Sequence, residues 1–137
     1  MNSSASATLS KLAQVLNSGS ASNFEVHVVG HTDSVPVSNP NTKRMFPDNM
    51  YLSAGRAIAV HHALKDDGVS PQRLMVAGWG EYRPAVTNNP GKSGTAPNRR
   101  VEIYLMPMTD ASGAMTAGTT TSTPTKKVET VSGEPMK

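Results

Sequence analysis

Two charged side chains, Asp33 and Arg56, have the types and the sequence surroundings expected of a site for a zwitterionic ligand. Asp33 ends the segment Gly30-His31-Thr32-Asp33, which follows an alternating apolar stretch, and Arg56 falls within the first turns of a predicted helix. A carboxylate can hold an ammonium group, and a guanidinium can hold a carboxylate through two parallel hydrogen bonds. Each charge-assisted bond contributes about 1.5–3 kcal/mol when it is shielded from water. A free amino-acid end or a diamino-acid side chain carries both charges, whereas nucleic acid has no ammonium group for Asp33.

The helix that carries Arg56 has a polar patch at the start of its buried side. Asn49, Ser53 and Arg56 lie within about 60° of one another, and Val60 and Leu64 continue the same side. The first turn of a helix also offers unpaired backbone N–H groups and the positive end of the helix dipole. We therefore expect this end of the helix to bind a carboxylate, with Arg56 adding a guanidinium.

Spacing alone leaves other interpretations of these charges open. Asp33 and Arg56 could simply pair and tie a loop to the helix, because ion-pair networks also gather charges in clefts. Arg99 and Arg100 alternate along a predicted strand, so only one of them can face the site, and we expect both to be solvated charges at the strand end. Asn98 fits either a turn or a pocket.

The positioning elements can be predicted from hydrophobic periodicity. Leu9, Leu12, Ala13 and Leu16 predict a helix over residues 7–17, and a second helix is expected over 49–65. Alternating apolar residues predict strands at 24–29, 74–77 and 100–106, separated by long loops at 31–47 and 81–97. The order predicts a parallel pair of strands joined through a helix and a final antiparallel strand, in an α/β sandwich. Two or three strands make a marginal sheet, so one strand should be missing.

The 137 residues allow one domain. We expect the domain to span residues 7–106. Residues 1–6 and the Thr-, Ser-, Gly- and Pro-rich tail, residues 107–137, are predicted to be disordered. There is no cysteine, no signal peptide and no apolar stretch long enough to span a bilayer. Any export signal or membrane attachment is therefore expected in parts of the protein outside this chain.

The net charge of +3 suits an anionic partner without selecting one. Nucleic acid is not expected, because no basic stripe with interleaved aromatic residues is present. The main enzymatic alternative is a metal-dependent hydrolase, which would use His27, His31, Asp33, His61 and His62. His61 and His62 are adjacent and point about 100° apart on a helix, so they cannot chelate as a pair four residues apart would. We therefore predict no catalytic residue, no metal site and no cofactor.

Four motifs in fixed order resemble the OmpA/MotB peptidoglycan-binding family: GHTD, NxxLSxxRAxxV, GxGExxP and NRRVEI. The resemblance runs from about Leu9 to Leu105, and the long loop that ends in Phe46-Pro47-Asp48-Asn49 is similar to the MotB branch. It implies an α+β fold, the OmpA-like two-layer α/β sandwich of order βα-βα-β-β, here lacking the first strand. It also implies non-covalent binding of the diaminopimelate-containing stem peptide of peptidoglycan, in the periplasm or elsewhere in the cell envelope, by a protein that is not an enzyme. A module of a flagellar-motor-type stator or another envelope interaction module is the alternative, and a homodimer stays open.

In that family the acid of the first motif and the arginine of LSxxRA hold the charged ends of the amino acid. The ligand-binding positions carried over to this chain are Asp33, Arg56, Thr32, Asn49, Leu52 and Asn98. The chain departs from the family at Met50, where an aromatic residue is common, and at Gly94-Thr95-Ala96-Pro97, where an arginine is usual. The second departure weakens the expectation of a second cationic contact. The missing first strand leaves an open sheet edge, which a truncation or a strand from a partner would explain.

Overall fold

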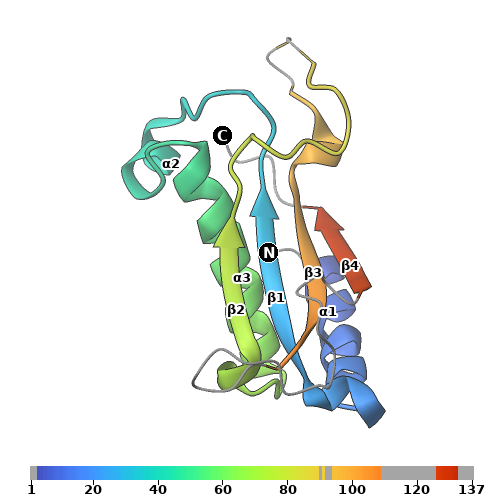
Figure 1. The fold of residues 1–137 in the computed structure, drawn as a ribbon. Helices are drawn as coiled ribbons and strands as arrows, with labels where there is room; N and C mark the ends of the chain where they lie inside the picture. The colour runs from blue at the N-terminus through green and yellow to red at the C-terminus, as the bar shows by residue number, and fades with distance from the viewer. Residues whose placement is uncertain (1–2, 90, 92–93, 109–125, 133–137) are drawn as a thin grey trace.

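Two long helices cover one face of a four-stranded mixed sheet in the computed structural model, which describes residues 3–89, 91, 94–108 and 126–132 (Figure 1). The strand order is β2-β1-β3-β4. The helices are α1 (Ser3–Leu16), α2 (Pro40–Met45) and α3 (Asn49–Asp66), and the strands are β1 (Phe24–His31), β2 (Leu74–Gly78), β3 (Arg100–Pro107) and β4 (Lys126–Ser132). Short 3₁₀ turns occupy Gly19–Asn23, Pro71–Arg73 and Ala96–Asn98.

The strand pairing follows from the connections between the strands. β1 and β2 are parallel because α3 crosses between them, and β3 runs antiparallel to β1. In register, Val28 of β1 lies between Val76 of β2 and Ile103 of β3. These pairings and the helices on one face confirm the predicted α+β sandwich.

The core lies between the two helices and the sheet. Leu9, Leu12, Ala13 and Leu16 of α1 are buried, as their spacing predicts. The other core residues come from β1, α3, the turn after α3 and β3: Val26, Val28, Ala57, Val60, Leu64, Val69, Val101 and Ile103. Each fully buried aliphatic side chain of this size contributes about 1.5–3 kcal/mol, so this layer fixes α3 against the sheet.

Two expectations about the ends of the chain are wrong where the structure describes them. α1 begins at Ser3, within the segment predicted to be disordered, because Ala5 also packs against the core. In the tail, Pro107 still belongs to β3, and Lys126–Ser132 form β4. The predicted disorder of residues 109–125 and 133–137 lies outside the described residues.

β4 occupies the outer edge of β3. The two strands run antiparallel from Arg100 opposite Ser132 to Leu105 opposite Lys126, with a register irregularity between Ile103 and Tyr104. An unpaired edge would expose the backbone N–H and C=O groups of β3 to other chains. An open sheet edge was expected, but within the described residues the C-terminal strand β4 pairs with the edge of β3.

The loop predicted over residues 31–47 contains the short helix α2. Its N-cap is Asn39, whose side-chain oxygen accepts hydrogen bonds from the N–H groups of Asn41 (2.9 Å) and Thr42 (3.3 Å). Pro40 takes the first helical position, where no N–H is needed. The pair Asn39-Pro40 was thus the sequence signal for the start of α2. No helix in the described part of the chain is both long and apolar enough to cross a bilayer.

Candidate functional site

The carboxyl ends of β1 and β2 meet the first turns of α3 at one end of the sheet. The N–H of Trp79 donates to the carbonyl of Gly30 (3.0 Å), and the N–H of Thr32 donates to the carbonyl of Gly80 (2.9 Å). The hydroxyl of Ser53 on α3 accepts a hydrogen bond from the N–H of Gly80 (2.9 Å). These bonds hold the segment His31–Asp33 beside the helix that carries Asn49 and Arg56.

Asp33 is buried, with 1% of its surface exposed. Its Oδ2 accepts hydrogen bonds from Arg99 Nη1 at 2.7 Å and from the N–H of Thr95 at 3.1 Å, and its Oδ1 accepts from the N–H of Val35 at 3.2 Å. Gly94 has a positive φ of 74°, and a Cβ there would collide with Asp33 Oδ2 and Arg99. The loop before β3 is therefore seated directly on this ion pair, and the absence of a side chain at Gly94 makes that approach feasible.

The role expected for the two strand-end arginines is wrong in one respect. Only one of them faces the site, as alternation predicts, but neither is a solvated charge. Arg99 pairs with Asp33, and its side chain is 12% exposed. Arg100 is 7% exposed and pairs with Glu102 on the opposite face of the sheet. A buried carboxylate such as that of Asp33 needs a cation nearby, and Arg99 is that cation. The departure from the family at Gly94–Pro97 had weakened the expectation of a second cationic contact.

Arg56 and Asn49 reach the same segment from α3. Arg56 is half-buried, and its Nη1 donates to the carbonyl of His31 at 3.3 Å. The Asn49 amide donates to the carbonyls of Asp33 (3.3 Å) and Val35 (3.1 Å). Its own Oδ1 is buried and has no hydrogen-bond partner among the described residues. The structure therefore brings Asp33, Arg56 and Asn49 together, with one unused acceptor.

Two of the other predicted site residues, Thr32 and Asn98, hydrogen-bond to the surrounding loops. Thr32 is buried, and its hydroxyl donates to the Asp33 carbonyl at 2.9 Å. Asn98 is fully buried, and it bonds the N–H groups of Ala85 and Val86, the carbonyl of Val86 and the side chain of Asn88. Leu52 is buried in the first turn of α3. Asn98 thus stabilises the loop before it, since both its Oδ1 and its Nδ2 form hydrogen bonds with that loop.

A second buried network of polar side chains lies across β1 and β3, on the face of the sheet opposite the helices. Glu102 accepts hydrogen bonds from Arg100 Nε (3.1 Å) and the Tyr104 hydroxyl (2.9 Å), and it contacts His31 Nε2 at 3.1 Å. Burial alone would raise the pKa of Glu102, but the bonds from Arg100 and Tyr104 and the nearby positive charge outweigh it and lower the pKa. Burial, reinforced by the charge of Arg100, lowers the pKa of His31 despite the opposing effect of Glu102. Sequence reasoning missed this network, because His31 and Arg100 become neighbours only through the strand register.

The lowered pKa of His31 predicts a loss of stability in mildly acidic solution. The unfolded chain takes up a proton on this imidazole below about pH 6.5, before the folded chain does. The stabilisation is therefore complete above that pH and is lost as the pH falls through the folded-state pKa. Urea unfolding from pH 8 to pH 5 should show this fall, and His31→Gln should flatten it. His62→Gln, which removes an exposed imidazole from α3, is the matched control, and an equal flattening there would contradict the assignment.

The histidines do not gather into a metal site in the described parts of the chain. His27 contacts Glu25 at 3.1 Å, His31 contacts Glu102, and His61 and His62 lie edge to face on α3. No group of three or more His, Asp or Glu side chains suited to a metal ion occurs among the residues described.

Comparisons with known proteins show the family and the fold of the chain. The family model of the OmpA family matches residues 1–99. Outer membrane porin F of Pseudomonas fluorescens is 42% identical over 80 residues, which is 58% of this chain and 22% of the porin. The peptidoglycan-associated lipoprotein of Pseudomonas putida is 47% identical over 55 residues, which is 40% of this chain and 32% of the lipoprotein. The chain thus covers less than a third of the length of these two relatives.

Among solved structures, the C-terminal domain of Helicobacter pylori MotB superposes with a TM-score of 0.67 and 25% identity. The match covers 82% of this chain and 80% of the MotB domain. The two-layer sandwich described above is therefore a fold shared with that domain.

Proposed function

Since the chain belongs to the OmpA family, we propose that it binds peptidoglycan without covalent chemistry and anchors a cell-envelope protein to the wall. One of the relatives is named a peptidoglycan-associated lipoprotein, and another is an outer-membrane porin. Neither name describes an enzyme. The finer part of the proposal is that the ligand is the diaminopimelate of a stem peptide, held at the mouth formed by Asp33, Arg56 and Asn49.

The observation that carries the proposal is the convergence of α3 and of the loop before β3 on one short stretch of backbone, His31–Asp33. Arg56 donates to the carbonyl of His31, and Asn49 donates to the carbonyl of Asp33. Asp33 forms an ion pair with Arg99, and Arg56 brings a second guanidinium charge to the same group of residues. That charge suits the carboxylate of the ligand, and the Asn49 amide holds the loop that carries Asp33 beside it. The ammonium group would approach Asp33, in competition with Arg99.

Arg56→Ala should weaken binding to purified peptidoglycan sacculi by about tenfold to a hundredfold, since one or two charge-assisted hydrogen bonds are lost. Co-sedimentation with sacculi measures this loss, and free meso-diaminopimelate should release the wild-type protein. Arg44→Ala removes an exposed guanidinium from α2 and serves as the control for net charge. Equal retention of wild type and Arg56→Ala, or no competition by diaminopimelate, would reject the assigned ligand.

A second candidate is an interaction module of a stator-like envelope machine, favoured by the shared fold with the MotB domain. It also requires wall binding, so the sacculus experiment tests the part that the two candidates have in common.

A further inference from the structure

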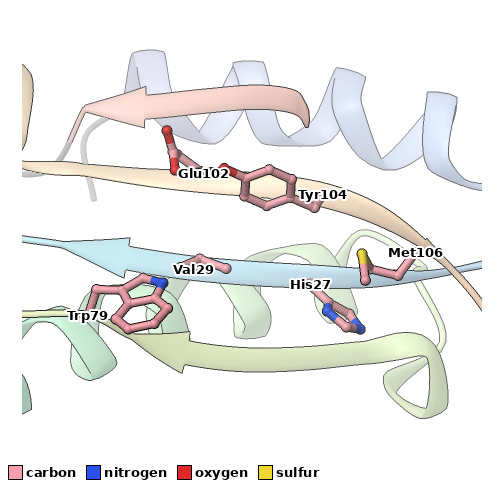
Figure 2. A pocket seen from close by; sticks show the side chains of 6 residues that line it. All are labelled: His27, Val29, Trp79, Glu102, Tyr104 and Met106. Carbon is pink, nitrogen blue, oxygen red and sulfur yellow. Dashed lines mark hydrogen bonds between the residues drawn. The ribbon is translucent and has the colours of Figure 1, made fainter. Parts of the chain in front are cut away.

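The face of the sheet opposite α1 and α3 carries a hollow of about 260 Å³ (Figure 2). Its floor comes from β1, its walls come from β3 and from the residue after β2, and the lining residues are His27, Val29, Trp79, Glu102, Tyr104 and Met106. In Figure 2 the side chains of Trp79 and Tyr104 stand on opposite sides of β1, with Val29 between them and His27 farther along the strand toward Met106. The hollow is therefore a trough between two aromatic rings.

The trough suits an uncharged ligand. Its one carboxylate, Glu102, already accepts hydrogen bonds from Arg100 and Tyr104 and contacts His31. A further cation would have to compete with that buried guanidinium. The remaining lining is aromatic, aliphatic or thioether, with the imidazole of His27 at the rim. Such a surface favours a ligand with apolar faces and polar edges.

Trp79 is the most exposed aromatic of the trough. It keeps 43% of its surface exposed, although the guanidinium of Arg83 stacks 4.0 Å from the centre of its ring. A large exposed indole costs solubility unless it contacts something, and here its backbone is fixed by the hydrogen bond to Gly30. A rigid, exposed aromatic ring can gain contact area on binding at little cost in conformational entropy.

The trough and the charged mouth adjoin each other along β1. Trp79 is hydrogen-bonded to Gly30, and Gly80 is hydrogen-bonded to Thr32, which precedes Asp33. A polymer with a charged peptide branching from a neutral saccharide strand could therefore contact both surfaces. We propose that the trough binds an uncharged saccharide unit of the glycan strand whose peptide enters the mouth at Asp33 and Arg56. This inference rests on the proposed function, and it adds a separate subsite with a separate ligand chemistry.

Trp79 is the only tryptophan of the chain, so its fluorescence reports on this trough alone. Titration with a peptide-free tetramer of N-acetylglucosamine should change the emission saturably, and calorimetry should give the same affinity. Trp79→Ala should weaken the tetramer by about tenfold or more, and Trp79→Phe should retain most of the binding. Arg83→Ala, which removes the stacked guanidinium but keeps the indole, should leave the affinity equal or higher.

The two subsites can fail independently. Asp33→Asn should lose the stem tripeptide and keep the tetramer, whereas Trp79→Ala should do the reverse. Absence of any fluorescence change and of any heat with the tetramer would overturn the saccharide subsite, even if the tripeptide binds normally. Unchanged tetramer affinity in Trp79→Ala would overturn it as well. If the wild-type protein does not bind the stem tripeptide, that result would instead count against the proposed function.

Discussion

Asp33→Asn is expected to abolish binding of the stem tripeptide, to weaken retention on peptidoglycan sacculi and to lower the free energy of unfolding by roughly 3 kcal/mol. The substitution keeps the shape of the side chain but removes the charge that Arg99 contacts at 2.7 Å. Arg99 would then be a largely buried guanidinium without that counter-charge, and breaking a buried pair from one side typically costs about 3–5 kcal/mol. The same change removes the group proposed to hold the ligand ammonium. Sacculus co-sedimentation and urea unfolding measure the two effects separately.

Arg99→Gln distinguishes a binding role of Asp33 from a purely structural one. It breaks the same ion pair and should also destabilise the fold, but it leaves the carboxylate in place and removes its competitor. Retained or tighter binding by folded Arg99→Gln, beside lost binding by folded Asp33→Asn, is the expected pair of results. If both variants lose binding equally at a temperature where both are folded, Asp33 acts only by holding the loop that ends in Arg99.

Periodicity predicted the parts of the fold in which one face is buried along a whole element. The spacing of Leu9, Leu12 and Leu16 gave the buried side of α1, and the alternation around Val26 and Val28 gave β1. The helix over 49–65 was predicted because Val60 and Leu64 continue the side of Ser53, and that side is buried in α3. Local patterns of this kind survive folding because the sheet and the helices bury whole faces rather than single residues.

The pairing partners could not be predicted, because they depend on contacts between distant segments. Nothing in the spacing of Asp33 and Arg99 indicates that they meet at 2.7 Å, and the loop that brings them together has no periodic pattern. β4 was missed because its composition resembles that of the polar residues before it, and its pairing with β3 depends on an edge formed elsewhere in the chain. The candidate site was therefore predicted as a set of residues, while its internal ion pair came only from the structure.

The absence of a side chain at Gly30 lets α3 approach β1 closely, and Gly30→Ala is expected to destabilise the protein by about 3 kcal/mol or more. A Cβ at this position would overlap the backbone carbonyl oxygen of Ser53. The nearest obstacle is backbone rather than a flexible side chain, so the whole helix has to move, and overpacking of a close-packed interior costs about 1–3 kcal/mol or more. The value is measured by urea unfolding.

Val29→Ala is the matched control, because it alters the adjacent residue on the open face of the same strand and removes only half-buried methyl groups. It should cost about 1 kcal/mol. The displacement caused by Gly30→Ala should also carry Asn49 and Arg56 away from His31–Asp33, since these residues sit on the helix that is pushed outward. Sacculus binding should then fall even under conditions where the variant is fully folded. If Gly30→Ala unfolds no more easily than Val29→Ala, the helix and the strand are not in the close contact from which the geometry of the mouth was argued.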